Sequence, residues 1–582
     1  MTDPPRLAAR LGVESRDVST RGASLDASRP VEVSGIVTPD DAITSGSGIG
    51  SALSSHSAVR FAVSSGATIA AFSGLVLLFY ARSAHYHGGT SDRATVILEG
   101  QAMAAGHLLL QSWNLTFASY WTSDVPFYAV AIRLGGLRPG LLYAGPAVMA
   151  ALVVVVGVLI AREGHHRAPG FVAGATVVAL LGFATPAMAF FFVGMGFHVG
   201  TVLYSLLAFA ALRRGRFGLG WALAVVLLAA GMLGDLMIVA YAVVPLALAG
   251  IVAGLRRRRW QSGIAQISAA ALSAGIAELT RHFAEARGAF VSRPELSLVH
   301  ASAIVSNLAH VPVYLADLLG LANGLDHNGG VPFGLREVHV VGALCVLVCL
   351  LVALYSLVKG AVRGEPEAQT AGESELWRLD DVLLITFFCS AVPFVAFARG
   401  DGASVRYLSL TVVFASVLAG RLVARGWTRL PSGRMLRAVA ALGVAVSLSF
   451  AAGAGYALSR PAPLNEVGTL VSWLEAHHLK YGVADYWAAS VTTVESKGDL
   501  IVRPVSASAG GALQQMTTLS SPEWYNGQEW QFLVYTKPFI DNVDLDAALR
   551  TWGPPARTYL VGPYHVVIWS YLISLPKPAS AE

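Results

Sequence analysis

Long uninterrupted runs of apolar residues limit what this sequence can fold into more than any other feature. Charged residues form only 13% of the 582-residue chain, against about 25% in a typical soluble domain. A helix of about 20 apolar residues spans the ~30 Å hydrocarbon core of a bilayer. The sequence therefore predicts a mainly α fold, a polytopic transmembrane helical bundle, and gives no indication of a nucleic-acid partner. We expect eleven spans, at residues 59–80, 137–161, 170–187, 197–212, 217–234, 236–255, 260–277, 338–359, 380–397, 404–424 and 434–457.

Basic residues in alternate connections indicate the orientation of the bundle. Short connections that share one side with the N-terminus hold most of the arginines, including the run of four at 256–259 and the five between 421 and 437. Short cytoplasmic loops carry an excess of Lys and Arg. The N-terminus is therefore predicted to be cytoplasmic, and an odd number of spans places the C-terminus outside a plasma membrane.

Composition also divides the chain along its length. Residues 1–58 are polar and rich in Ser, Asp, Pro and Gly, which predicts a disordered cytoplasmic tail. Residues 59–457 form the predicted transmembrane domain, with long external loops at 81–136 and 278–337; the stretch "RATVILEGQAMAAGHLLL" in the first is expected to form a helix along the membrane surface. In 458–582, "NEVGTLVSWLEAHHL" favours an amphipathic helix, and "LIVRPVSA", "FLVYT" and "TYLVGPYHVVIWSYL" favour strands. This last part is predicted to be a small external α/β domain.

Ionisable residues close to the spans gather on the predicted external side, while the span centres carry almost none. A charge in hydrocarbon costs about 2.5–3.5 kcal/mol, so each such group needs water, a partner or a function. Transporters usually place ionisable residues or broken helices near the bilayer midplane. The pattern instead favours an enzyme that acts on a lipid-borne substrate at headgroup depth. The residues are Asp92, Glu99, Asp124, His198, Asp235, Arg399, Asp401 and Arg406.

Several of these residues lie in segments that resemble the GT-C superfamily of integral-membrane glycosyltransferases. In "SDRATVILEGQAMAAG", Asp92 takes the place of the family's first-loop acid, and "YWTSDVPFY" supplies Asp124 before Pro126. "VRYL" resembles the Arg-Tyr pair at the start of a late span, here Arg406 and Tyr407, and "GFHVGTVLYSLLAF" and "GDLMIVAYAVVPL" are similar to further span regions. One departure is that Asp92 is followed by Arg93, whereas protein O-mannosyltransferases and aminoarabinose transferases usually have adjacent Asp-Glu.

The resemblance implies a fold, an activity and partners. It implies a GT-C-like bundle that transfers a hexosyl or pentosyl group from a polyprenyl-phosphate sugar donor to a glycan, lipid or protein acceptor on the outer face. An oligosaccharide ligase or polymerase, a non-enzymatic transporter or flippase of glycolipids, and a scaffold that uses 458–582 as a binding module stay open as alternatives. No spacing of metal ligands stands out, although Asp92 and Asp124 are compatible with Mg²⁺ or Mn²⁺, because oxygen-only sites leave little sequence signature.

Sugar transfer needs a base for the acceptor hydroxyl and cations for the departing phosphate. Asp92 is the candidate base, and its alternative role is to cap the helix that follows it. Arg406 is the candidate phosphate clamp, because a guanidinium meets phosphate in a bidentate fork; the alternative is an arginine that extends to lipid headgroups. Arg399 is a weaker second clamp, and Tyr407 accompanies Arg406 at the substrate.

Three further residues are candidates for substrate binding. Asp124 is expected to bind the acceptor or a cation, or else to start the turn at Pro126. Asp235 is either a substrate ligand or a turn residue between two spans, and His198 either meets substrate or is a hydrogen-bonded interface histidine. Glu99 is expected on the water-facing side of its helix.

Overall fold

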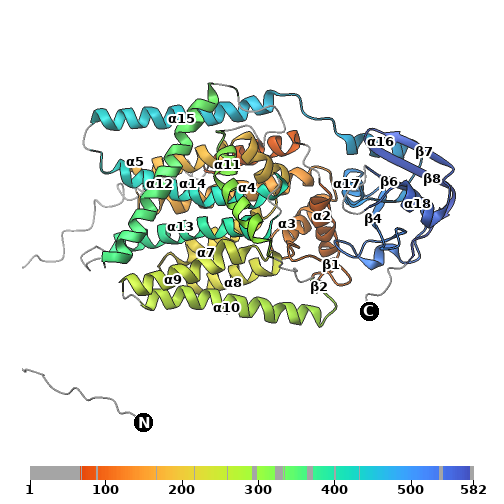
Figure 1. Cartoon of the computed structure of the whole chain (residues 1–582), viewed down its shortest axis with the longest axis horizontal. Helices are drawn as coiled ribbons and strands as arrows, with labels where there is room; N and C mark the ends of the chain where they lie inside the picture. The colour runs from red at the N-terminus through yellow and green to blue at the C-terminus, as the bar shows by residue number, and fades with distance from the viewer. Residues whose placement is uncertain are drawn as a thin grey trace, which may run out of the picture. The chain divides into compact units, whose positions relative to one another are not determined.

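The computed structural model describes residues 66, 68–86, 90–165, 167–214, 217–257, 260–291, 298–321, 332, 334–363, 371–398, 402–430, 433–536 and 542–576 (Figure 1). The predicted tail at 1–58 lies outside these residues. Contacts group Thr68–Glu582 into one compact unit. The boundary expected at 457/458 does not divide that unit, and a separate external domain stays a prediction.

All eleven apolar runs fall on helices where the structure describes them. The first helix covers residues 68–85. The others are α4 (Leu141–Arg162), α5 (Arg167–Val177) with its π-helical continuation η1 (Val178–Gly182), α7 (Val199–Ala211), α8 (Leu219–Gly234), η4 (Val239–Val243) with α9 (Val244–Arg257), α10 (Trp260–Glu285), α12 (Leu335–Arg363), α13 (Ala371–Phe397), α14 (Arg406–Trp427) and α15 (Gly433–Ser459).

Six helices are long and apolar enough to cross a membrane, or up to seven with a bent pair. The pair joins Arg167–Gly182 to Pro186–Met195 at an angle of 77°, where a proline opens α6 (Pro186–Ala189) ahead of η2 (Phe190–Met195). The helices at 125–135, 199–211, 219–234 and 239–255 are shorter. Large apolar side chains on α12, such as Leu344, Leu347 and Leu351, stay exposed, as lipid-facing residues do. The chain is therefore a multi-pass membrane protein, and the number of eleven crossings is not confirmed.

Helix α14 is the most buried of the candidate spans. Within its most apolar window, 83% of the residues are buried. Arg421 near its far end is fully buried and donates to Asp380 Oδ1 at 2.5 Å and to the Ile160 carbonyl at 2.7 Å. A buried guanidinium needs such partners. Because α14 begins at Arg406, this fixed helix also sets the position of the Arg-Tyr pair.

The region predicted as the first external loop is largely structured. It contains α2 (Ser91–Ala104), the two-residue strand β1 (Asn114–Leu115) and α3 (Val125–Gly135). Strand β1 pairs in parallel with β2 (Phe290–Val291), which joins the first long loop to the second. The second loop also contains α11 (Ala301–Leu318), a helix that the sequence analysis did not predict.

The C-terminal part has the mixed α/β structure that the sequence predicts. Its six-stranded sheet has the order β5-β4-β3-β6-β8-β7, and β3 runs parallel to both of its neighbours. The strands are β3 (Tyr481–Ala484), β4 (Ile501–Ala507), β5 (Leu513–Gln515), β6 (Trp530–Tyr535), β7 (Arg557–Val561) and β8 (Tyr564–Ile573). The helices are α16 (Glu466–Ala476), α17 (Tyr486–Glu495) and α18 (Leu545–Trp552).

Helix α17 fastens this sheet to α2. Ser91 Oγ donates to the Trp487 carbonyl at 3.0 Å, and the hydroxyls of Thr95 and Ser490 are 3.0 Å apart. Val491 and Val494 of α17 belong to the same apolar cluster as Ile97 of α2. A chain segment far away in sequence thus covers the helix that carries Asp92.

Candidate functional site

Asp92 lies in the first turn of α2 and faces the C-terminal part. The Tyr486 hydroxyl, at the start of α17, donates a hydrogen bond to Asp92 Oδ1. Burial raises the pKa of Asp92, while the Tyr486 bond and the charges of Arg406 and Arg93 oppose that rise. A carboxylate with a raised pKa is a stronger base than one in water, which suits proton abstraction.

The predicted capping role of Asp92 is wrong, because Thr90 is the N-cap of α2 and its side chain accepts from the Arg93 amide. Asp92 stands two residues further into the helix, so its carboxylate is available to Tyr486. The expectation for Glu99 is also wrong: this residue is fully buried, and neither carboxylate oxygen has a hydrogen-bond partner among the described residues. Burial raises the pKa of Glu99 well above its ordinary value, because a site without water disfavours the charged form.

Arg93 ties α2 to the membrane helices. Its guanidinium donates to the carbonyls of Leu142 at 2.6 Å, Gly194 at 2.6 Å and Met195 at 2.5 Å. These carbonyls belong to the start of α4 and to η2. One buried side chain of α2 therefore holds α2, α4 and η2 together. Gly196 makes room for it, since a Cβ there would lie 2.9 Å from the Arg93 guanidinium.

Asp124 stands at the N-terminus of α3 but forms no capping hydrogen bond there. Its Oδ2 instead accepts from Ser123 Oγ at 2.7 Å. The carboxylate rests against Gly200 of α7, where a Cβ would lie 2.4 Å from Oδ2. The pKa of Asp124 is raised to about 6, mainly by burial and to a smaller extent by the negative charge of Asp235.

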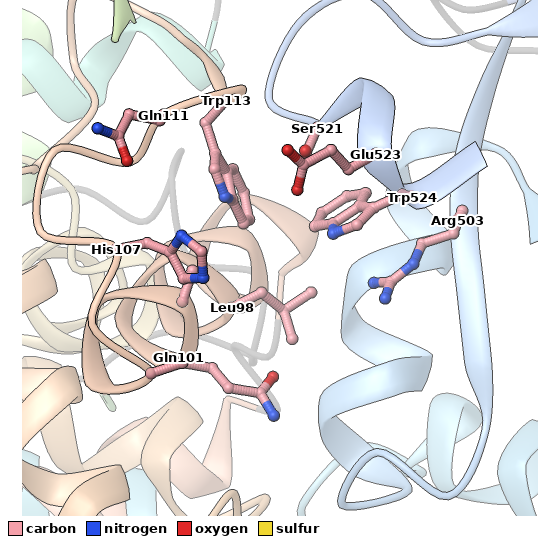
Figure 2. Close-up of a pocket in the computed structure, with 11 residues that line it drawn as sticks. Leu98, Gln101, His107, Gln111, Trp113, Arg503, Ser521, Glu523 and Trp524 are labelled. Carbon is pink, nitrogen blue, oxygen red and sulfur yellow. The ribbon is translucent and has the colours of Figure 1, made fainter. Parts of the chain in front are cut away.

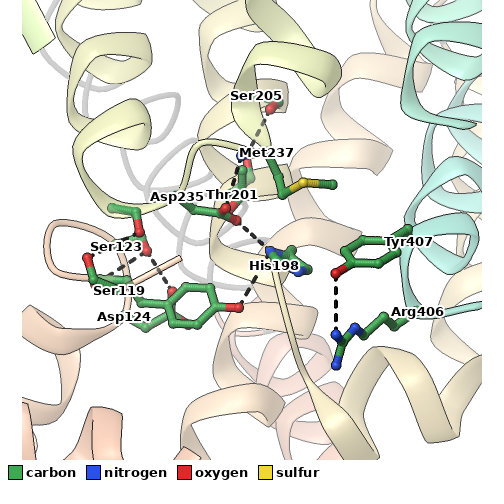
Figure 3. Close-up of polar contacts among 12 residues, drawn as sticks. Ser119, Ser123, Asp124, His198, Thr201, Ser205, Asp235, Met237, Arg406 and Tyr407 are labelled. Carbon is green, nitrogen blue, oxygen red and sulfur yellow. Dashed lines mark hydrogen bonds and ion pairs between the residues drawn. The ribbon is translucent and has the colours of Figure 1, made fainter. Parts of the chain in front are cut away.

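Asp235 and His198 form a buried pair between α7 and the turn after α8 (Figure 3). His198 Nδ1 lies 2.7 Å from Asp235 Oδ2, which also accepts from the Thr201 hydroxyl, while Oδ1 accepts from the Met237 amide at 3.0 Å. Asp235 is therefore a turn residue that also binds His198, and its predicted role as a substrate ligand stays a prediction. A carboxylate at Nδ1 fixes the ring and leaves Nε2 as the nitrogen that can take a proton.

Two residues of the cluster have strained backbones. Tyr120 has φ of 56° and His198 has φ of 60°, in the left-handed region that bulky side chains rarely adopt. Such conformations cost roughly 1–3 kcal/mol each and concentrate at functional sites. The Tyr120 hydroxyl also lies 3.5 Å from His198 Nδ1.

Arg406 and Tyr407 stand at the first turn of α14, on the opposite side of His198 from Asp235 (Figure 3). The Arg406 guanidinium donates to the Tyr407 hydroxyl at 3.3 Å and lies 5.5 Å from the centre of the Phe197 ring. Its Nε is buried and has no hydrogen-bond partner among the described residues. The Tyr407 ring is 5.7 Å from the His198 ring.

The Tyr120 hydroxyl lies within the electrostatic reach of the candidate site residues. Burial raises the pKa of its hydroxyl well above the ordinary value, Asp235, Asp124 and Asp92 raise it further, and Arg406 opposes them. Three carboxylates and one guanidinium therefore act electrostatically on a single hydroxyl, although they come from four separate parts of the chain. Arg399, the other predicted clamp, and Asp401 lie outside the described residues.

Asp92 and Asp124 do not by themselves make a fitting site for a divalent cation. One oxygen of each already accepts a hydrogen bond, and the positive charge of Arg93 acts on both. Over the described ranges there is no group of three or more His, Cys, Asp or Glu side chains that could hold a metal. Mg²⁺ or Mn²⁺ at this pair stays an untested prediction.

The sequence analysis missed Tyr486, Tyr120 and Thr201 as members of the cluster. The contact of Tyr486 with Asp92 depends on how α17 packs on α2, which local sequence patterns do not reveal. Thr201 lies one helical turn after the N-terminus of α7, three residues from His198, so the spacing alone could have linked the two.

Comparisons with known proteins give only distant likenesses. Neither family models nor curated proteins match the sequence. Among solved structures, the chain is similar to ArnT from Cupriavidus metallidurans bound to undecaprenyl phosphate, with 13% identity, coverage of 86% of this chain and 98% of that chain, and a TM-score of 0.47. It is also similar to the Archaeoglobus fulgidus oligosaccharyltransferase in the apo form, with 11% identity, coverage of 80% and 69%, and a TM-score of 0.41. Identities and scores this low support no conclusion about activity, which therefore rests on the residues of the site.

Proposed function

We propose that this protein is a membrane glycosyltransferase of the GT-C type, which transfers a sugar from a polyprenyl-phosphate donor to an acceptor hydroxyl. The observation that carries the proposal is that His198 is bound to Asp235 at 2.7 Å, lies 3.5 Å from the Tyr120 hydroxyl and has its ring 5.7 Å from that of Tyr407, the partner of Arg406. The charges of Asp92, Asp124 and Arg406 also act on this Tyr120 hydroxyl. A buried group of carboxylates beside an arginine supplies both the base and the anion-binding cation that this reaction needs.

Asp92 is the base in this mechanism. The acceptor oxygen attacks the anomeric carbon of the donor sugar, and the bond from that carbon to the phosphate oxygen breaks. The acceptor proton moves to the Asp92 carboxylate, and the lipid phosphate leaves with the bonding electron pair. The Tyr486 hydrogen bond holds the carboxylate in one orientation during this step.

Arg406 binds the departing phosphate. Its guanidinium has one bond to Tyr407, so most of its donors are available to phosphate oxygens, and charge-assisted bonds of this kind are about twice as strong as neutral ones. His198, oriented by Asp235, stands between the phosphate end and Asp124 and is placed to bind a sugar hydroxyl. Asp124 binds the acceptor.

The location of the reaction follows from the orientation rule. The basic connections favour a cytoplasmic N-terminus, which supports an outward-facing α2 and C-terminal sheet and a reaction at the outer face of the plasma membrane. The proposal extends to a hexose or a pentose as the transferred group.

The direct test measures lipid phosphate released from an undecaprenyl-phosphate sugar by the purified full-length protein. Asp92→Asn keeps the size of the side chain but removes the base, and we expect the rate to fall by about 10²–10⁴-fold. Asp546→Asn, an exposed carboxylate in the first turn of α18, is the matched control and should leave the rate unchanged. An unchanged rate in Asp92→Asn would remove the base from the proposal.

A second measurement separates an enzyme from a transporter or flippase. A transporter predicts counterflow of glycolipid in vesicles that survives both Asp92→Asn and Arg406→Gln, without release of lipid phosphate. Release of a polyprenyl diphosphate from a diphosphate-linked glycan would instead favour a ligase or polymerase.

A further inference from the structure

A polar cavity that none of the candidate site residues lines lies between α2 with the segment after it and the C-terminal sheet (Figure 2). Its volume is about 320 Å³, at the lower end of the ~300–1,000 Å³ usual for small-molecule sites. Gln101, His107 and Trp113 line one wall, and Arg503, Glu523 and Trp524 line the other. None of these residues belongs to the proposed catalytic machinery.

Two tryptophans give the cavity its shape. The rings of Trp113 and Trp524 are 4.8 Å apart at an interplanar angle of 80°, so they form a corner rather than a stack. Tryptophan combines a large apolar face with a polar N–H, which suits a ligand with both apolar C–H and hydroxyl groups. A pyranose ring has this character on its two faces.

Arg503 adds a positive charge that no carboxylate pairs with among the described residues. Its guanidinium lies 4.1 Å from the centre of the Trp524 ring, and Figure 2 shows it directed toward the cavity. Its Nε is buried and without a hydrogen-bond partner in the part of the chain that the structure describes. Burial lowers the pKa of Arg503 to about 10, so the group stays charged at neutral pH. A charge that is partly withdrawn from water in this way is stabilised when an anion binds it.

The opposite charge in the cavity does not neutralise Arg503. Glu523 is exposed, and its Oε1 accepts from Ser112 Oγ at 2.7 Å. No ion pair joins Glu523 to Arg503 among the described residues. Water and salt screen the exposed carboxylate more than the partly buried guanidinium.

The two walls are held together by backbone hydrogen bonds. The Asn114 amide donates to the Ser520 carbonyl at 2.9 Å, and the Leu519 amide donates to the Asn114 carbonyl at 2.9 Å. Asn114 follows Trp113 directly, and Ser520 lies four residues before Trp524. The bonds therefore hold the two tryptophans in place, and the cavity is formed before any ligand binds. A preformed site loses little entropy on binding.

We propose that this cavity binds a sugar that carries a carboxylate or a phosphate, with the anion on Arg503 and the ring in the corner of Trp113 and Trp524. The assignment of this sugar as part of the acceptor rests on the proposed function, whereas the binding itself does not. The acceptor is then an acidic glycan, and the C-terminal sheet contributes to its selection.

The test measures affinity by calorimetry on the purified full-length protein without donor. The probes are trigalacturonate, the neutral maltotriose, glucose 6-phosphate and glycerol 3-phosphate. We expect at least one acidic sugar to bind about tenfold or more tightly than maltotriose. A tenfold difference in affinity corresponds to about 1.4 kcal/mol of binding free energy. Arg503→Gln should abolish this preference, Arg503→Lys should retain part of it, and the exposed Arg557→Gln in β7 should retain all of it.

The outcomes separate the two proposals. Asp92→Asn should bind the acidic sugar as the unaltered protein does, so a failure of transfer leaves this inference standing. Three results would overturn the inference of an acidic-sugar site. The first is equal affinity for maltotriose and trigalacturonate with no preference for glucose 6-phosphate. The others are an unchanged preference in a folded Arg503→Gln and no binding of any probe. Binding of glycerol 3-phosphate as tight as that of glucose 6-phosphate would show an anion site that does not recognise sugar, which also overturns it.

Discussion

Removal of the Tyr486 hydroxyl deletes one hydrogen bond of the proposed base. Tyr486→Phe keeps the aromatic packing of α17 against α2 but deletes the hydrogen bond to Asp92 Oδ1. That bond stabilises the ionised carboxylate and so lowers a pKa that burial has raised. Without the bond, the pKa of Asp92 rises further, and the base takes up its proton at a higher pH.

The size of the change follows from the strength of such a bond. A hydrogen bond to a charged group contributes about 1.5–3 kcal/mol. One pKa unit corresponds to about 1.4 kcal/mol, so loss of the bond should raise the pKa of Asp92 by about one to two units.

The assay is the pH dependence of kcat/KM for lipid-phosphate release, whose acid limb reports the base of the free enzyme. In Tyr486→Phe this limb should move to higher pH by about one to two units, while the rate at high pH is largely retained. Tyr571→Phe, an exposed tyrosine whose hydroxyl donates to the Trp552 carbonyl, should leave the profile unchanged. An acid limb that stays in place or moves to lower pH would refute the assignment of Asp92.

Three further changes test the surroundings of the site. Gly200→Ala places a Cβ 2.4 Å from Asp124 Oδ2 and should reduce kcat/KM on the order of 10²-fold by displacing the carboxylate; equal rates in Gly200→Ala and in Gly455→Ala, where a Cβ meets nothing within 4 Å, would contradict this. Arg93→Gln should lower the unfolding temperature in detergent, because each buried carbonyl left unpaired costs about 1–3 kcal/mol, whereas the exposed Arg133→Gln should not. Asp124 has a pKa raised to about 6, so its contribution to stability is present in acid and is lost as pH rises through that value. Near pH 8, Asp124→Asn should therefore have a larger free energy of unfolding than the unaltered protein, by on the order of 3 kcal/mol, and a higher unfolding temperature. Near pH 4 we expect no such gain. The same gain at both pH values would argue against a buried titrating carboxylate.

The apolar runs determined much of the fold in advance. Hydropathy located all six of the long apolar helices among the described residues, because hydrocarbon admits almost no unpaired polar group, so composition and position are tightly linked. It did not locate the bent half at Pro186–Met195. Alternating strands and turn residues likewise located β4, β6, β7 and β8. The same rule does not count crossings, since α7 and α8 are apolar but short.

Side-chain pairing was decided by the tertiary structure. Asp92, Asp235 and Arg406 could be placed near one face of the membrane from the sequence, but not beside a common hydroxyl. Glu99 shows what the sequence could not predict. Its helix α2 looks half polar in sequence, yet other helices cover it on several sides, and its carboxyl is fully buried. One of these helices is α17, which lies almost four hundred residues further along the chain. Hydrophobic periodicity reports only the average environment of a helix face. Which segment covers that face depends on long-range packing, and this packing also created the cavity at Arg503.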